Sequence, residues 1–154
     1  MLKKPLLLFM LAFGISAAAM AQDSQRTLNL EEVKSMVKAA EERAKKDNWN
    51  VVIAVMDAGG HLVYLQRMDG VQIASIEVAQ KKAKAAAFYK RPTKVFEEGL
   101  KSGNQGLMLL PGVIASEGGV PIVHDGQVIG AVGVSGVTSA EDGIIANSAI
   151  DALK

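Results

Sequence analysis

Apolar residues at spacings of three and four predict the helices of this chain. Residues 30–44 place them on one face and charged side chains on the other. Residues 75–89 are predicted to form a second helix, whose small apolar face can lie close to a sheet or to a flat ligand. Pro92 interrupts the chain after it, so a short helix capped by Thr93 is predicted to end near residue 101. Two capping-box patterns mark the beginnings of the first helix and of a last one: Asn29 with Glu32, and Thr138 with Glu141.

Short runs rich in β-branched residues predict the strands. The first run is apolar throughout, which is typical of a strand covered on both faces, and a glycine turn joins it to the second as a hairpin. Pro121 cannot donate a backbone hydrogen bond, so its strand is expected at a sheet edge. The predicted strands are residues 51–56, 61–67, 113–116, 120–124 and 127–134.

Hairpins join most of the neighbouring strands, and helices come before, between and after them. This order predicts an α+β fold rather than a doubly wound one. We expect a single domain with a mainly antiparallel five-stranded sheet flanked by helices.

The first 21 residues have the pattern of a secretory signal peptide. Lys3 and Lys4 precede an apolar stretch, and small residues suit cleavage after Ala21. The apolar stretch is shorter than the roughly 20 residues that span a bilayer. We therefore expect a periplasmic or secreted protein that is not embedded in a membrane, with a mature domain of residues 22–154.

Composition excludes several classes of function. Loss of Lys3 and Lys4 from the 17 basic residues would leave 15 against 16 acidic residues, a net charge of −1. This balance argues against a nucleic-acid partner held through its phosphates. The chain has no cysteine, which excludes disulfides and thiolate ligands for zinc, haem iron or iron–sulfur clusters.

The sequence contains no recognisable catalytic constellation. It has no Gly-x-Ser-x-Gly or His-Glu-x-x-His motif, and its two histidines, His61 and His124, lie beside predicted turns. An enzyme is therefore not favoured.

A slot for a planar ligand is an alternative to catalysis. Methionines and aromatic residues can form its walls, with a lysine at the rim to meet a carboxylate. Haem, which is planar and apolar with anionic tails, would suit such a slot. The same residues also suit an ordinary core and a solvated helix face. They are Met56, Met68, Phe88, Tyr89 and Phe96, with Lys81, Lys82 and Lys84.

Four ordered segments resemble the GlcG/HbpS family, also called haem-degrading or PduO carboxy-terminal-like domains. The resemblance implies a compact α+β domain that frequently forms homo-oligomers, with some members binding haem or a related tetrapyrrole. Secreted members are associated with haem sensing, iron handling or haem breakdown. The segments are residues 52–70, 79–83 with a Lys-Ala pair, 118–122 (Gly-Gly-Val-Pro-Ile) and 125–136.

The resemblance also implies where a ligand would lie. The candidate cofactor-binding residues are Lys82, Tyr89, Val120, Pro121 and His61. Val120 stands where some members have a hydroxyl proposed to meet the iron, so direct ligation requires His61, His124, Tyr89 or a methionine. We expect Lys82→Glu to weaken the binding of an anionic ligand while leaving the fold intact.

Three functions stay open from the sequence. The first is an exported protein that binds haem or a related planar anionic ligand and stores it, transfers it or reports it to a membrane sensor partner. The second is an oligomeric accessory or sensor domain for a non-haem metabolite. The third is an enzyme that opens haem and releases iron, with a reductant and oxygen as co-reactants.

Overall fold

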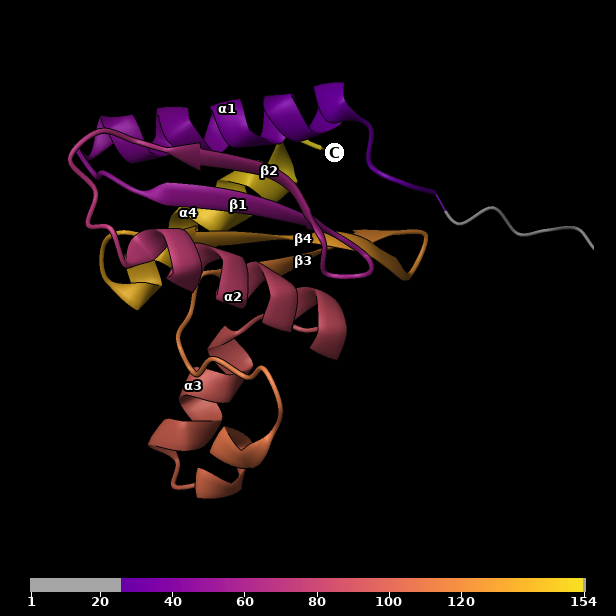
Figure 1. The fold of residues 1–154 in the computed structure, drawn as a ribbon, viewed down its shortest axis with the longest axis vertical. Helices are drawn as coiled ribbons and strands as arrows, with labels where there is room; N and C mark the ends of the chain where they lie inside the picture. The colour runs from indigo at the N-terminus through magenta and orange to yellow at the C-terminus, as the bar shows by residue number, and fades with distance from the viewer. Residues whose placement is uncertain (1–25, 154) are drawn as a thin grey trace, which may run out of the picture.

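The computed structural model describes residues 26–153, so the predicted signal peptide lies outside the described residues. None of the helices in this range is both long and apolar enough to cross a membrane. The elements follow one another along the chain as Figure 1 shows: α1 (Leu30–Lys46), β1 (Val52–Asp57), β2 (Leu62–Arg67), α2 (Ser75–Tyr89), α3 (Lys94–Lys101), the 3-10 helix η1 (Gln105–Leu109), β3 (Gly119–His124), β4 (Gln127–Ser135) and α4 (Ser139–Asp151).

The strands form one antiparallel sheet in the order β2-β1-β4-β3. Asp57 at the end of β1 pairs with Gly130 near the start of β4, so the β1–β2 and β3–β4 turns lie at the same end of the sheet. We call this the hairpin end. β3 is an edge strand, which confirms the prediction made from Pro121.

The sheet has four strands rather than the predicted five. Residues 113–116 form an irregular connection with partly buried side chains that leads from η1 back to β3. A run of four residues is too short for its pattern to separate a strand from an extended connection. The α+β class and the antiparallel arrangement are otherwise as predicted.

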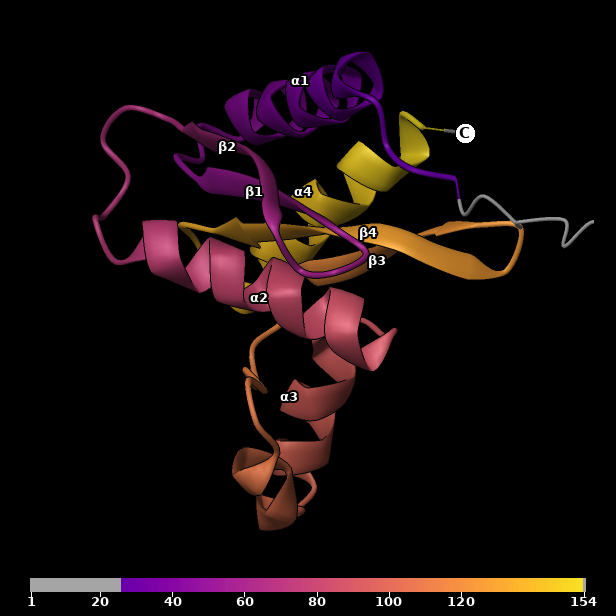
Figure 2. The same cartoon turned by 45° about the vertical axis from the view of Figure 1, so that its right-hand side comes forward.

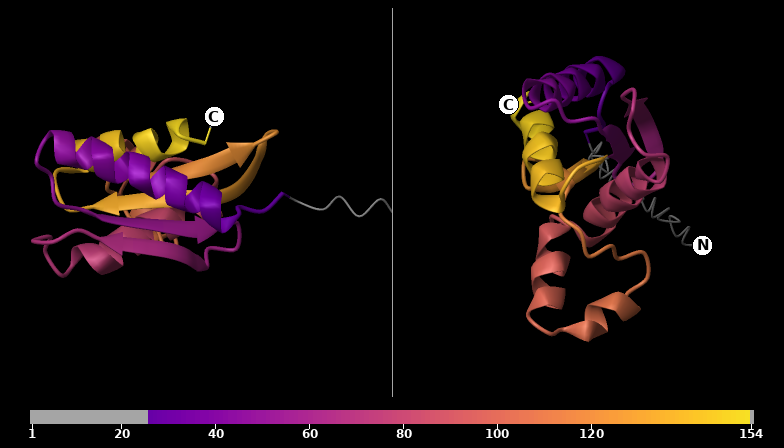
Figure 3. Two further views of the ribbon diagram at one scale, coloured as in Figure 1. Left: turned by 90° about the horizontal axis from the view of Figure 1, so that it is seen from above. Right: turned by 90° about the vertical axis from the view of Figure 1, so that its left-hand side faces the viewer.

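Helices cover both faces of the sheet. α1 and α4 lie side by side on one face and α2 lies on the other, as Figures 2 and 3 show. β1 contributes to both layers: Ile53 and Val55 pack with α1 and α4, and Val52 and Ala54 pack with α2. This confirms the prediction of a strand covered on both faces.

Small residues allow α2 to lie close to the sheet. A Cβ at Gly133 of β4 would lie 2.5 Å from the backbone nitrogen of Ala83 and 2.9 Å from its Cβ. The alanine-rich face of α2 is therefore covered by the sheet and is not a free surface for a flat ligand.

Helix caps account for the beginnings of α1 and α4. The capping boxes of Asn29 with Glu32 and of Thr138 with Glu141 both form, as predicted. Thr93 precedes α3 as predicted, but its side chain makes no cap hydrogen bond. Its hydroxyl instead accepts a hydrogen bond from the Gly119 N–H at 2.9 Å, because α3 begins beside the start of β3.

α3 and η1 form an arm that extends beyond the sheet (Figure 1). Glu97 fixes its base: one carboxylate oxygen accepts the Glu117 N–H at 2.6 Å, and the other accepts the Ser139 hydroxyl at 3.1 Å. The arm is thereby joined to the connection before β3 and to the first turn of α4.

Candidate functional site

A buried ion pair connects the helices on opposite faces of the sheet. Lys82 Nζ of α2 lies 2.8 Å from Asp142 Oδ2 of α4, and each side chain is only 2% exposed. The pair passes the amino end of the edge strand β3, where the two helix layers meet.

Two glycines at this end of β3 leave space for the pair. A Cβ at Gly118 would lie 2.9 Å from Asp142 Cβ and 3.0 Å from Lys82 Nζ. A Cβ at Gly119 would overlap with the backbone carbonyl of Lys82 and lie 2.7 Å from Thr93 Cγ2. The Gly-Gly motif is therefore explained by packing around an internal ion pair.

Burial dominates the electrostatics of the pair. It raises the pKa of Asp142 to about 6, although Lys82 and the backbone N–H groups of Val137 and Gly136 act in the opposite direction. The Lys82 ammonium is inside the protein, not at the rim of a slot. Lys82→Glu would place two carboxyl groups side by side in the interior, so the expectation that this substitution leaves the fold intact is wrong.

Tyr89, Val120 and Pro121 do not converge on one surface. The Tyr89 hydroxyl donates to the Pro111 carbonyl at 2.8 Å, and its ring packs edge-on against Phe96, so Tyr89 holds the arm. Val120 packs against the core beneath α1 and α4, on the face away from α2. Pro121 pairs with Ala131, which clusters with alanines of α2.

His61 lies in the β1–β2 turn with its side chain 82% exposed. Asp57 accepts the His61 backbone N–H at 2.9 Å through Oδ1, and its Oδ2 lies 3.2 Å from His61 Nδ1. Burial alone would raise the pKa of Asp57, but these hydrogen bonds lower it. An ionised carboxylate can only accept, so Nδ1 carries the hydrogen and Nε2 is available to a ligand.

The carboxyl half of α2 lies directly beside this turn. A Cβ at Gly60 would lie 2.9 Å from Phe88 Cζ and 3.2 Å from Lys84 Cγ. Phe88 is 52% exposed, and Lys84 Nζ lies 5.3 Å from the centroid of its ring. We call His61, Lys84 and Phe88 the turn–helix surface. It combines an imidazole, an exposed aromatic ring and a cation.

His124 lies at the same end of the sheet but in a different setting. It is the last residue of β3, and its Nε2 lies 3.3 Å from the neighbouring Asp125 carboxylate. No group of three or more His, Asp or Glu side chains among residues 26–153 is arranged to hold a metal ion.

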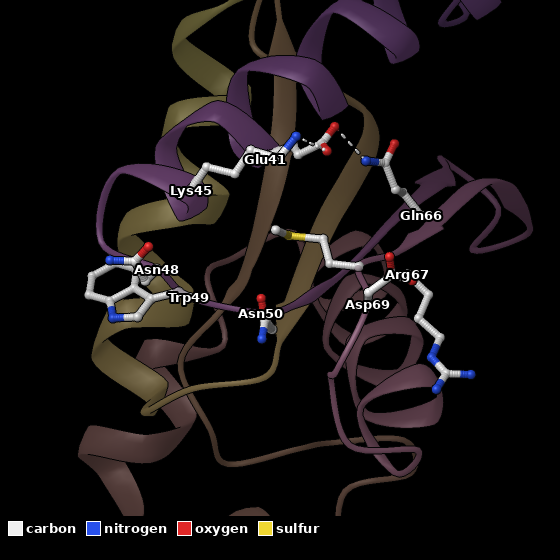
Figure 4. A pocket seen from close by; sticks show the side chains of 9 residues that line it. Glu41, Lys45, Asn48, Trp49, Asn50, Gln66, Arg67 and Asp69 are labelled. Atoms are coloured by element: carbon white, nitrogen blue, oxygen red, sulfur yellow. Dashed lines mark hydrogen bonds and ion pairs between the residues drawn. The ribbon is translucent and has the colours of Figure 1, made fainter.

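A cavity of about 580 Å³ lies at the opposite end of the sheet from the hairpins (Figure 4). Nothing in the sequence indicated it, because α1, the connection to β1 and the end of β2 contribute its walls. The side chains lining it are Glu41, Lys45, Asn48, Trp49, Asn50, Gln66, Arg67, Met68 and Asp69.

Sequence and structure comparisons place the chain among proteins with a common fold. Residues 28–151 match the family model of haem degrading proteins of the HbpS-like type. Protein GlcG of Escherichia coli K12 is 46% identical over 101 residues, which cover 66% of this chain and 75% of GlcG.

Two solved structures are similar to this chain along most of their length. A crystal structure of a PduOC:haem complex is 32% identical with a TM-score of 0.72, covering 82% of this chain and 95% of that one. A double mutant of Streptomyces reticuli HbpS is 28% identical with a TM-score of 0.80, covering 91% of this chain and 96% of that one. The chain therefore belongs to the GlcG/HbpS family.

Proposed function

We propose that this protein binds haem or a related planar, anionic tetrapyrrole at the turn–helix surface. The observation that carries the proposal is the orientation of His61 by Asp57 within the β1–β2 turn, against which Phe88 of α2 packs at Gly60. The similarity to a PduOC:haem complex supports haem as the ligand class.

His61 has the arrangement of a metal-ligating histidine. Such histidines commonly donate their second ring N–H to a carboxylate, which fixes the tautomer and the direction of the ring. Asp57 accepts in this way from Nδ1, leaving Nε2 exposed at the surface. His61 is therefore our candidate for the axial ligand among the alternatives that the sequence left open, which were His61, His124, Tyr89 and a methionine.

Phe88 and Lys84 fit the remaining parts of the same ligand. The half-exposed aromatic ring offers an apolar contact for a flat macrocycle. The Lys84 ammonium, close to that ring, can pair with a carboxylate. Bound haem would supply an iron centre that an imidazole nitrogen can ligate. It would also supply carboxylates that can pair with a cation.

Titration with haemin tests this assignment. We expect a saturable Soret band with the unchanged protein and a loss of affinity of at least tenfold in His61→Ala, because even the outer partners of a metal ligand typically change metal affinity by about 10–100-fold. His124→Ala is the matched control, since it removes an imidazole from the neighbouring hairpin. A non-saturating response would contradict haem binding, and equal behaviour of the two variants would contradict ligation by His61.

A second candidate function is oxidative haem degradation, which the description of the matching family favours. It predicts that bound haem bleaches and releases iron only when a reductant and oxygen are both supplied. Stable spectra under these conditions would leave binding alone as the function.

We also propose that the protein acts in the periplasm or outside the cell, after cleavage near Ala21. The support is the signal-peptide pattern of residues 1–21. Amino-terminal sequencing of the protein from a periplasmic or culture fraction tests it, and a retained Met1 would contradict it. Homo-oligomers and a membrane sensor partner stay predictions, of which the first is measured by light scattering.

A further inference from the structure

The cavity in Figure 4 is separate from the proposed haem surface. It lies where α1 ends, β1 begins and β2 ends, whereas His61 is in the turn at the other end of β1 and β2. Its volume of about 580 Å³ is within the roughly 300–1,000 Å³ that is typical of small-molecule sites.

The charges that line the cavity balance one another. Glu41 accepts hydrogen bonds from Lys45 and from Gln66, each at 2.6 Å, and these bonds lower the pKa of Glu41 and keep it ionised. Arg67 and Asp69 add one charge of each sign, and Figure 4 shows the guanidinium directed away from the other side chains. The formal charges of the four charged residues therefore sum to zero, and the lining does not strongly favour an anion.

Several polar groups in the cavity are available to a ligand. Within residues 26–153, the side chains of Asn48, Asn50 and Asp69 make no hydrogen bond or ion pair. Two amides offer donors and acceptors, and the carboxylate offers acceptors. A ligand rich in hydroxyl groups matches this set, because each hydroxyl both donates and accepts.

The cavity wall also includes an aromatic ring. Trp49 is held by Arg43, whose guanidinium lies 5.1 Å from the ring centroid. A tryptophan combines an apolar face with an N–H donor. Such a wall suits the C–H face of a sugar ring while the amides bind its hydroxyls.

The backbone holds these groups in place. The Met68 N–H donates to the Val51 carbonyl at 3.0 Å, which keeps the segment after β2 beside the start of β1. Gly70 has φ of +77°, and a Cβ there would lie 3.1 Å from Asn50 Nδ2. Glycine adopts this positive φ without strain, so the turn after Asp69 can lie close to the Asn50 amide.

We propose that this cavity binds a small neutral polyhydroxylated ligand of the monosaccharide class. Asn50 and Asp69 supply hydrogen bonds to its hydroxyls, and Trp49 supplies an apolar wall. This site is independent of haem binding at the hairpin end.

Fluorescence offers a direct test, because Trp49 is the single tryptophan of the chain. The full chain is titrated with glucose, galactose and mannose to about 10 mM, a range in which a millimolar Kd is visible. Calorimetry is run in parallel. We expect a saturable signal with at least one of these sugars. No saturation by either method, or saturation by glycine betaine or galacturonate alone, would overturn the proposal.

Substitutions locate the binding site. Asp69→Ala and Asn50→Ala are both at exposed positions, and each should weaken sugar binding about tenfold, the loss expected for a hydrogen bond to a polar or charged group. Glu98→Ala, at an exposed position on the arm, is the control. Equal sugar affinity in all three variants would refute the assignment to this cavity. Haemin titrations of Asp69→Ala should match those of the unchanged protein.

Discussion

Lys82→Met should destabilise the protein in a way that depends on pH. The substitution leaves the Asp142 carboxyl buried without its cation, and breaking a buried ion pair costs about 3–5 kcal/mol. At pH 8 we expect a loss of stability of about 3 kcal/mol, the lower end of this range. The unpaired Asp142 carboxyl can take up a proton, which limits the cost of burying it. At pH 5 the loss should be below about 1 kcal/mol, since the wild-type carboxyl, with a pKa of about 6, is then already mostly protonated.

Urea unfolding at the two pH values measures this difference. At a typical slope for a small domain, 3 kcal/mol lowers the midpoint by roughly 1.5 M. Lys82→Met/Asp142→Asn contains no buried charge and should recover at least about 2 kcal/mol at pH 8. Lys81→Met, which removes an exposed pair with Glu77 on the same helix, should cost less than about 1 kcal/mol. Equal losses for Lys82→Met at pH 5 and pH 8 would refute the reasoning.

Urea unfolding also tests three further predictions. Burial raises the pKa of Asp142, so its contribution to stability is present below about pH 4 and is lost as the pH rises through about 6. The stability of Asp142→Asn relative to wild type should therefore increase by roughly 2 kcal/mol between pH 4 and pH 7, and a constant difference would contradict this. Gly119→Ala should cost about 3 kcal/mol because its Cβ overlaps backbone, whereas Gly106→Ala, which meets only an ordinary contact, should change stability by less than about 1 kcal/mol. Thr93→Val should cost about 1–3 kcal/mol by leaving the buried Gly119 N–H without an acceptor, while the exposed Thr27→Val should be near neutral; equal effects would argue against the hydrogen bond.

The sequence by itself determined the local elements and their class. Periodicity located α1, α2 and α4, and Pro92 with Thr93 located α3. The cap residues Asn29 and Thr138 marked the beginnings of α1 and α4. The continuous apolar run in β1 indicated burial on both faces, and Pro121 indicated an edge strand. These features could be predicted because each depends on side-chain spacing or on a missing backbone donor within a few residues.

The candidate site depended on the tertiary structure. The sequence grouped His61, Lys82, Tyr89 and Val120 by resemblance, but the fold separates them, because residues on one helix or one strand point to different sides.

Only packing brings Lys82 to Asp142, which lies 60 residues away on the other helix layer. The choice between four strands and five also depended on packing, since residues 113–116 have a strand-like composition but lie in the connection from the arm. The polar cavity is formed by three segments that only the sheet brings together. In each case a side chain's surroundings come from residues distant in sequence, so local pattern determines the element and the fold determines its environment.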